Sequence, residues 1–588
     1  MIINLNFDKR KVIELIHHYP NEKILDITGV LQNQNLNQKV IFARQIDEDH
    51  FIEKQSIENY VQTIGELGTL SHRKININSL PLWWLTKLSE KHDRFHWGQS
   101  VFFLLELFKL KKEIFFKEIK FILPDKNPGI SKFLNENLNE NSQFKFSFIN
   151  PKPDTINQYF LYRSMIKPIL LYLKFKALLF FKPLSKKQKN KHFFIVNNYE
   201  TANTNSDNFD INWVKKLVNS ATKNSTNIPI PNFYKLGQLD LSRENINHFC
   251  NYSPKVSSIL FTFYKVIRLS KKLNQSIEPI KSNGIIFNTE LLISEFKSVL
   301  HNSNLFLAHL WMKNYSKKNP EKIFIYSDEM YQIGRVLSHA LNTNLSNKTV
   351  GVQHGLITPN HTVYRITEHE INEQNSIPLP SKIILWNSVF SNYMTKTCSK
   401  IKTHFIFSND YHYIEMVKNV HLLQKKKSGH KFNVLWATTL WEHFISEYEV
   451  IKPLFDFNSI HLTIRLHPAN HIAQNQINEK LKAKDFIFST SSYEIDLSET
   501  DLVISNTFST VFYDASKLNL PTFRIEHYGS FCDFETTNNQ VVDINNSLQF
   551  KKQLEDIISK ISSVSNKNTR KITSNTNTLL ETKNYLEI

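Results

Sequence analysis

The sequence predicts an α/β protein with parallel sheets, and two observations carry this prediction. Short runs of apolar and β-branched residues, typical of buried strands, recur along the chain, as at residues 349–352 and 501–504. A polar tip and a segment with helical spacing follow such runs, and this alternation is typical of parallel strands joined by crossover helices. Open parallel sheets bind ligands at the carboxyl ends of their strands, so the polar tips are the candidate site residues.

Length and composition narrow the class of protein. A chain of 588 residues is too long for one hydrophobic core, and 41% hydrophobic with 21% charged residues is ordinary for a globular protein. The three cysteines (Cys250, Cys398 and Cys532) are far apart and form no CxxC pair. This pattern argues against a disulfide framework or a thiolate zinc site and fits a reducing cytosol. Residues 1–10 contain no signal-peptide core, so we expect a cytoplasmic protein.

The charge balance indicates an anionic partner. The formal net charge is +18, which attracts nucleic acid, anionic lipid headgroups, acidic glycans or nucleotide donors. The sequence contains neither an arginine-rich arm nor zinc-finger spacing, so we expect no nucleic acid partner.

The N-terminal part is expected to be an α/β extension with strands near residues 22–28 and 119–124. Between them lie two aromatic segments, residues 82–85 and 97–108. Core packing is the favoured interpretation of these aromatics, and a sugar-stacking or acceptor-binding surface is the alternative, because aromatic faces suit carbohydrate rings.

Residues 166–183 form the most hydrophobic segment, but lysines interrupt it and prolines bracket it (Lys167, Lys174, Lys176, Lys182, Pro168 and Pro183). A spanning helix needs about 20 apolar residues with few charges, so we do not expect a transmembrane segment. Two interpretations stay open: a core helix with a solvated edge, or a helix in the membrane interface whose lysines reach the headgroups.

Two strand tips are predicted in the middle of the chain. A strand at 321–327 ends in Asp328 and Glu329, a helix follows at 334–341, and the strand at 349–352 ends in Gln353, His354 and Gly355. If the two strands are neighbours, the tips lie side by side.

The pattern restarts after an expected interdomain loop at 366–380. Strands are predicted at 382–387, 432–437, 460–465 and 501–504, giving a smaller Rossmann-like domain. We therefore expect an N-terminal α/β domain at 1–375 (alternatively 1–185 plus 186–375), a C-terminal domain at 381–545, and a helical to poorly ordered tail at 546–588.

The polar residues that follow the strands predicted at 460–465 and 501–504 are candidates for binding phosphate. His467 can donate a hydrogen bond to it, and Arg465, two residues earlier on the same strand face, can add charge or pair with an acid. The turn after residue 504 either contacts phosphate or caps the following helix; its candidate residues are Ser505, Thr507, Ser509 and Thr510. Glu526 is a candidate for contacting ribose or sugar hydroxyls.

The middle tips suit a general base. Histidine has an unperturbed pKa near 6.5, so His354 can act as the base or as a cationic ligand of phosphate. A carboxylate pair can hold one raised pKa, so Asp328 and Glu329 are the alternative, and the residues do not decide between these options. Gly355 permits positive φ or close approach of a ligand to the backbone.

Taken together and in this order, the tips of residues 321–526 resemble the nucleotide-sugar transferases of bacterial surface polysaccharides with the GT-B architecture. The similarity is to the group of capsule enzymes, teichoic-acid glycerophosphate polymerases, Kdo-transferases and polysialyltransferases. The resemblance implies two Rossmann-like domains facing a cleft, here with an N-terminal α/β extension. It also implies that the Ser/Thr turn contacts donor phosphate and that His467 takes part in donor binding.

The expected activity is transfer of a sugar from a nucleotide-activated donor to a lipid-linked or growing surface polysaccharide, such as capsule, lipopolysaccharide or O-antigen. No cofactor or metal is expected, since GT-B enzymes need no divalent ion for donor binding and no DxD motif sits at a strand tip. We expect peripheral association with the anionic inner face of the cytoplasmic membrane. The alternatives are a CDP-polyol glycerophosphotransferase-like polymerase, a sugar-nucleotide 2-epimerase and a non-catalytic basic polyanion-binding protein.

Overall fold

The structure is a computed structural model of the 588-residue chain. It describes residues 1–6, 9–28, 31, 40–43, 46–47, 50–67, 74–91, 97–123, 129–138, 144–149, 158–181, 193–197, 225–327, 330–353, 355–358, 361–371, 376–408, 420, 432–438, 447–457, 459–467, 486–506, 509–525, 541–544 and 546–563.

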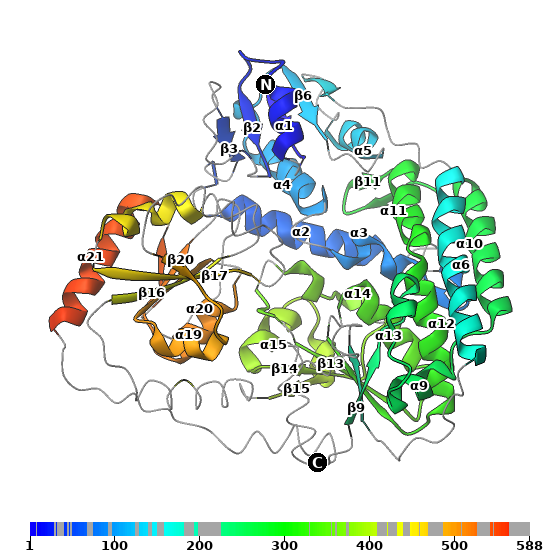
Figure 1. The fold of residues 1–588 in the computed structure, drawn as a ribbon. Coiled ribbons are helices and arrows are strands. Elements are labelled where there is room, and N and C mark those ends of the chain that lie inside the picture. Colours follow the sequence, from blue (N-terminus) through cyan, green and yellow to red (C-terminus); the bar gives the residue numbers. More distant parts are fainter. Residues whose placement is uncertain are drawn as a thin grey trace.

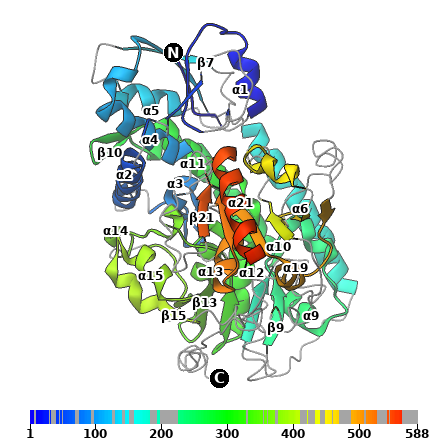
Figure 2. The ribbon, with the colours of Figure 1, turned by 90° about the vertical axis from the view of Figure 1, so that its left-hand side faces the viewer.

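Three sheets of parallel strands organise the described chain. The N-terminal sheet has the order β3-β2-β1-β6-β7. Its strands are β1 (Ile2–Asn4), β2 (Ile24–Asp26), β3 (Val40–Phe42), β6 (Glu118–Ile122) and β7 (Lys145–Ile149). Strands β2 and β6 confirm the two expected in this region. This sheet lies apart from the other two at one end of the molecule in both views (Figures 1 and 2).

The middle sheet has the order β15-β14-β13-β12-β8-β9, with every pair parallel. Its strands are β8 (Phe193–Asn197), β9 (Ser225–Pro229), β12 (Ile323–Tyr326), β13 (Lys348–Val352), β14 (Lys382–Leu385) and β15 (Phe405–Phe407). Strands β12 and β13 are neighbours, as the side-by-side arrangement of their tips requires. The order of strands reverses between β8 and β12, which makes their carboxyl ends the topological switch point of this sheet.

The C-terminal sheet has the order β18-β17-β16-β19-β20-β21, again with every pair parallel. Its strands are β16 (Phe432–Ala437), β17 (Ile460–Arg465), β18 (Phe486–Phe488), β19 (Leu502–Asn506), β20 (Thr522–Ile525) and β21 (Val541–Ile544). In chain order this is 3-2-1-4-5-6, the order of doubly wound nucleotide-binding sheets, and it places the switch point between β16 and β19.

Helices cover the three sheets. The N-terminal region contains α1 (Lys9–Ile16), α2 (Phe51–Leu67), α3 (Lys87–Glu90), α4 (Trp97–Leu110) and α5 (Gly129–Leu138). The next are α6 (Gln158–Phe181), α9 (Glu244–Cys250), α10 (Val256–Ser276), α11 (Thr289–His301), α12 (Ser303–Lys318), α13 (Gln332–Leu341), α14 (Glu368–Ile371) and α15 (Ser388–Thr395). The C-terminal region contains α19 (Tyr493–Glu499), α20 (Val511–Lys517) and α21 (Ser547–Ser563). The predicted fold class, α/β with two Rossmann-like units and an N-terminal α/β extension, is confirmed.

Two predictions about the boundary between the Rossmann-like units are wrong. Strand β14 was expected to open the C-terminal domain at residue 381, yet it pairs with β13 and β15 in the middle sheet. Residues 366–380 therefore connect two strands of one sheet and are not an interdomain loop. The change of sheet falls between Phe407 and Phe432. The reason is that an apolar run predicts a strand without specifying which strands it will pair with.

The aromatic segments of the N-terminal region pack in the core, as favoured from the sequence. Trp83 and Trp84 are 1% and 0% exposed, and the Trp83 ring lies 6.3 Å from the ring of Phe296 on α11. These indoles are therefore not a surface for sugar rings.

Helix α6 contains residues 166–181 of the hydrophobic segment predicted at 166–183 and has Pro168 inside it, while residues 182 and 183 lie outside the described residues. One face is buried through Tyr172, Phe175 and Leu179. Among the helices that the structure describes, none combines the length and the apolar character needed to cross a bilayer.

Candidate functional site

The tip of β13 is built around the buried side chain of Gln353. Its Oε1 accepts a hydrogen bond from the backbone N–H of Trp386 at 2.9 Å, and its Nε2 donates to the carbonyl of Gly355 at 2.8 Å. The indole N–H of Trp386 also donates to the carbonyl of Gln353, at 3.1 Å. One amide thus ties the tips of two neighbouring strands together and shapes the loop that follows β13.

The middle and C-terminal sheets meet immediately beyond this tip. The Nδ2 of Asn387 donates to the hydroxyl of Tyr513 on α20 at 2.5 Å. The Tyr513 ring lies 6.1 Å from Trp386 and 5.7 Å from Phe390. Because α20 follows β19, this contact joins the carboxyl ends of β14 and β19 across the two sheets.

The switch point of the C-terminal sheet holds a fully buried carboxylate, Glu447. It accepts hydrogen bonds at 3.0 Å from the indole N–H of Trp436 on β16 and at 3.0 Å from the amide of Asn506 at the end of β19. Thr438, the residue after β16, donates its backbone N–H to the carbonyl of Arg465 at 3.0 Å. These bonds fix the ends of three adjacent strands where a nucleotide binds in sheets of this order.

Glu447 and Asn506 were not among the site residues predicted from the sequence. Asn506 lies two residues after the strand predicted at 501–504 and could have been found by its position in the polar tip. Glu447 lies outside every predicted strand, so no local pattern distinguishes it from the other acidic residues.

Of the four Ser/Thr residues predicted in the turn after residue 504, the structure describes Ser505, Ser509 and Thr510. Ser505 lies within β19 and is 0% exposed, and its Oγ has no partner among the described residues. Ser509 is half-buried, and its Oγ accepts from the N–H of Val511 at 3.2 Å. Thr510 immediately precedes α20 and makes no side-chain cap bond. Ser509 therefore accepts a hydrogen bond at the start of the helix, and its own O–H donates to no described residue. The burial of Ser505 keeps its hydroxyl from the surface.

Arg465 and His467, at and beyond the end of β17, differ in their exposure. Arg465 contacts Asp496 through Nη1 at 2.6 Å and the carbonyl of Ser491 at 3.1 Å, so the alternative of pairing with an acid holds. His467 lies two residues beyond the strand and is exposed.

Five predicted site residues lie outside the described residues: His354, Asp328, Glu329, Thr507 and Glu526. Gly355 is described, and positive φ is not the reason for a glycine there, since the described glycine with positive φ is Gly284. A Cβ built at Gly355 would meet no atom of the described residues within 4 Å, apart from its chain neighbours, so these residues leave space beside its backbone.

A buried ion pair joins the N-terminal region to the segment after β13. Lys91, at the end of α3, contacts Glu370 on α14 at 2.6 Å and the carbonyl of Arg365 at 2.6 Å, and both ionic side chains are almost completely buried. Burial lowers the pKa of Lys91, and the negative charge of Glu370 opposes that effect. The pair anchors the loop that carries His361 and Arg365 against α3.

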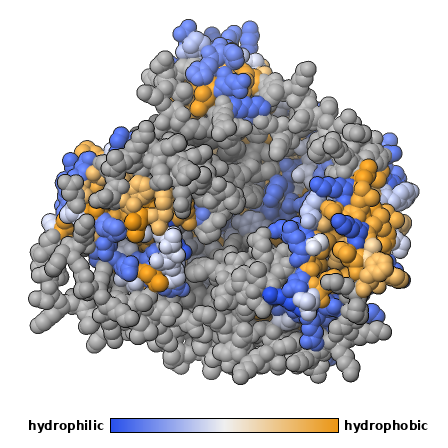
Figure 3. Space-filling view, viewed as in Figure 1, coloured by the Kyte–Doolittle hydropathy of each residue, from blue (hydrophilic) through white to orange (hydrophobic). Residues whose placement is uncertain are grey.

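The surface is hollowed between the C-terminal sheet and the side that carries α6 and α10, with hydrophilic residues in the hollow (Figure 3). In the part of the chain that the structure describes, no group of three or more His, Cys, Asp or Glu residues is arranged to hold a metal ion.

No protein-family model matches the sequence, and no curated protein matches it. Among solved structures, the chain is similar to UDP-GlcNAc 2-epimerase from Neisseria meningitidis bound to UDP-GlcNAc, with 11% identity, 63% of this chain and 92% of that chain covered, and a TM-score of 0.35. It is also similar to the wall teichoic acid polymerase TagF, with 9% identity, 70% and 90% covered, and a TM-score of 0.31. A third is the catalytic domain of starch synthase IV from Arabidopsis thaliana bound to ADP and acarbose, with 10% identity, 44% and 70% covered, and a TM-score of 0.26. At these identities and TM-scores we rest no functional argument on the similarities.

Proposed function

We propose that the protein is a glycosyltransferase of GT-B architecture that uses a nucleotide-activated sugar. The observation that carries the proposal is the doubly wound strand order of the C-terminal sheet, because sheets of this order bind nucleotides at the switch point, which here lies between β16 and β19. This sheet meets the tip of β14 in the middle sheet through Asn387 and Tyr513. Two parallel sheets that meet through their strand ends give a donor side and an acceptor side.

In this proposal, Ser509, Thr510 and His467 donate hydrogen bonds to the donor phosphates, with Arg465 adding positive charge nearby. Such donors stabilise the charge that develops on the leaving phosphate. A base at the middle tips, His354 or one of Asp328 and Glu329, takes the proton of the acceptor hydroxyl as the new glycosidic bond forms. Gly355 leaves room for the sugar beside the backbone.

The acceptor in this proposal is a lipid-linked or growing surface polysaccharide. A polymerase that moves glycerol phosphate or ribitol phosphate from a CDP-polyol would use the same sheet geometry, and so would a sugar-nucleotide 2-epimerase. The epimerase is distinguished by turnover of the donor without any acceptor. A basic polyanion-binding protein would keep its binding when His467 and Ser509 are replaced.

The proposal also places the enzyme at the inner face of the cytoplasmic membrane. Helix α6 exposes Leu170 (60%), Phe180 (86%) and Phe181 (81%), and α10 beside it exposes Phe261 and Tyr264 (56% each). We name these five residues the apolar face; hydrophobic residues gather over α6 and α10 in Figure 3. Large exposed apolar surfaces mark sites of interaction, and the net charge of +18 favours an anionic bilayer.

Lysines of α6 and α10 lie close to aromatic rings on or near the apolar face. The Nζ of Lys265 lies 4.5 Å from the centre of the Phe261 ring, and Lys167 lies 5.5 Å from the ring of Tyr234. Cationic groups beside aromatic rings suit the headgroup level of a membrane, which supports the interface interpretation of α6.

The test of the donor site is a thermal-shift screen against CMP, CDP, UDP, GDP and their sugar or polyol conjugates, without added metal. A ligand that binds only the folded protein raises its melting temperature by an amount that grows with the ratio of ligand concentration to Kd. We expect one nucleotide class to raise it, and the shift to shrink in Ser509→Ala and His467→Ala. No shift at millimolar nucleotide would contradict the proposal.

A further inference from the structure

A cavity of about 420 Å³ lies at the carboxyl edge of the middle sheet. Its walls come from four places: the segment after β9, the first residues of α12, the first residues of α13, and α3 of the N-terminal region. Its volume falls within the range of about 300–1,000 Å³ that is usual for small-ligand sites. Because β9 and β12 flank β8, the cavity adjoins the β8/β12 switch point, where sheets of this order bind ligands.

The walls of the cavity carry amide groups with unused hydrogen-bonding capacity. The side chain of Asn302 has no hydrogen-bond partner among the described residues, although it occupies the cap position of α12. Asn304 uses its Oδ1 to accept from the N–H of Phe233 at 3.0 Å, and its Nδ2 donates to no described residue. Both side chains are only half-buried, so they can reach a molecule in the cavity.

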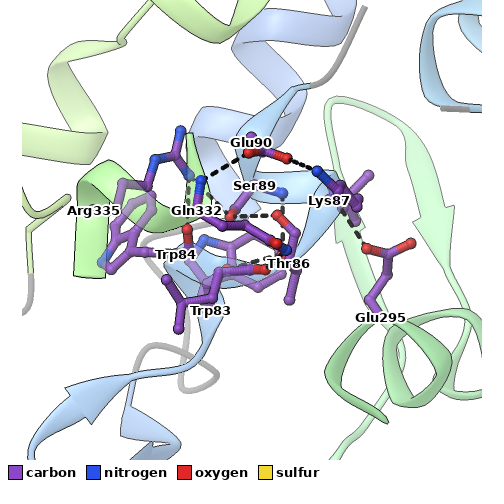
Figure 4. A network of polar contacts seen from close by, with 11 residues as sticks. Trp83, Trp84, Thr86, Lys87, Ser89, Glu90, Glu295, Gln332 and Arg335 are labelled. Carbon is purple, nitrogen blue, oxygen red and sulfur yellow. Dashed lines mark hydrogen bonds and ion pairs between the residues drawn. The ribbon is translucent and has the colours of Figure 1, made fainter. Parts of the chain in front are cut away.

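A polar network holds the α3 and α13 walls in place (Figure 4). Glu90, which is 1% exposed, accepts from Lys87 Nζ at 2.5 Å and from the backbone N–H of Gln332 at 2.8 Å. Behind them, the Nη1 of the buried Arg335 donates to the carbonyl of Trp84 at 2.8 Å and to Ser89 Oγ at 3.3 Å. Gln332 Nε2 also donates to the carbonyl of Leu85. The walls are therefore organised before any ligand arrives, which lowers the entropy lost on binding.

The composition of the walls favours a polyhydroxylated ligand over a phosphate. Amide, hydroxyl and carboxylate groups alternate with apolar side chains, and this mixture matches the hydroxyls and C–H faces of a sugar ring. The lining holds two lysines and one carboxylate, and Glu90 already neutralises Lys87. Tyr331, also in the lining, follows the last residue of β12, Tyr326, by five residues in the sequence.

We infer that this cavity binds a sugar unit of the acceptor glycan, with the amides of Asn302 and Asn304 contacting its hydroxyls. The inference rests on the proposed function and adds a defined acceptor position to it. The growing chain would occupy the middle sheet and the N-terminal region, while the nucleotide occupies the C-terminal sheet.

The test is saturation-transfer difference NMR on the full chain with a mixture of N-acetylglucosamine, galactose and glucuronic acid, and with glycerol as the acyclic control. We expect at least one pyranose, and not glycerol, to receive saturation. The Kd for the responding pyranose, measured by titration in the same experiment, should rise about fivefold in Asn302→Leu, which is the effect of one lost net hydrogen bond. The matched control is Asn314→Leu, an exposed asparagine farther along the same helix, which should leave the Kd unchanged.

The outcomes separate this inference from the donor site. No response from any pyranose, or an unchanged Kd in Asn302→Leu with an unchanged melting temperature, overturns the inference while the nucleotide thermal shift still stands. A nucleotide shift that survives in Asn302→Leu, together with the weakened sugar response, supports two separate sites. If a pyranose receives saturation but no nucleotide raises the melting temperature, the cavity is a carbohydrate site and the proposed transferase function is wrong.

Discussion

Trp386 donates two hydrogen bonds to Gln353, from its backbone N–H to Gln353 Oε1 at 2.9 Å and from its indole N–H to the Gln353 carbonyl at 3.1 Å. They are 33 residues apart in the sequence and end neighbouring strands. Trp386 in turn lies against Tyr513 of the C-terminal sheet. The loop that follows β13 is therefore connected to the opposing sheet through two side chains.

Gln353→Leu removes this connection and leaves the buried N–H of Trp386 without its acceptor. We expect a loss of about 1–3 kcal/mol in the free energy of unfolding, measured by urea denaturation, because an unsatisfied buried donor carries its full desolvation penalty. The exposed Gln275→Leu on α10 is the matched control and should change stability by less than about 0.5 kcal/mol. Equal effects of the two changes would contradict a structural role for Gln353.

Glu447→Leu should damage the switch point of the C-terminal sheet. It leaves the indole N–H of Trp436 and the amide of Asn506 without a common acceptor. We expect destabilisation of about 2–4 kcal/mol, and a smaller nucleotide-induced rise in melting temperature at any given nucleotide concentration. Glu449→Leu replaces an exposed carboxylate two residues away and should have neither effect.

Lys91→Met should unpair the buried carboxylate of Glu370 and destabilise the protein by about 3–5 kcal/mol. The double change Lys91→Met with Glu370→Gln removes both charges while keeping an acceptor for the N–H of Thr367. We expect it to recover part of the lost stability in the same denaturation experiment. A double variant as unstable as the sum of the two single changes would show that the two charges are not coupled.

Stability should fall as the pH drops from about 6.5 to about 4. His309 Nε2 lies 3.0 Å from His339 Nδ1, and burial lowers the pKa of His339 to about 4 and that of His309 well below its ordinary value. Above pH 6.5 both states carry neutral imidazoles, so stability is complete there. Below pH 6.5 the imidazole of His339 is protonated in the unfolded chain, whereas in the folded protein it stays neutral until about pH 4. This difference favours unfolding by up to roughly 3 kcal/mol for His339.

The pH prediction is checked by urea unfolding at pH 7.5, 6.0 and 4.5. Carboxylates also titrate in this interval, so the comparison is with His339→Gln. We expect a shallower loss of stability in that variant than in the wild type. Parallel curves would assign the pH dependence to other groups.

Replacing Phe180 and Phe181 by serine should weaken binding to vesicles containing phosphatidylglycerol by at least about tenfold, since each buried phenylalanine contributes about 1.5–3 kcal/mol. Flotation of the protein with the vesicles measures the effect. Leu345→Ser removes an isolated leucine that is 95% exposed outside the apolar face and is the matched control. If the wild type does not float, or the double serine variant floats equally well, the membrane role is wrong.

Much of the fold could be predicted because strands with several consecutive apolar residues are recognisable locally. Strands β12, β13, β17 and β19 are of this kind. Among the strands that were not predicted, β3, β15 and β18 have three residues each and lie at the edges of their sheets. These segments are too short to show the alternation of apolar and polar residues that predicts a strand. They form strands because a neighbouring strand provides hydrogen-bond partners.

The sequence by itself determined the α/β class, the positions of the main strands and the polar character of their tips, since apolar runs and the residues that end them are local properties. Tertiary structure decided which sheet β14 joins, and it brought Glu447 to Asn506 across 59 residues. It also enclosed the cavity beside Asn302 from segments as distant as α3 and α12. Pairing, buried hydrogen bonds and cavities depend on which surfaces exclude water together, and no single segment of the chain encodes that.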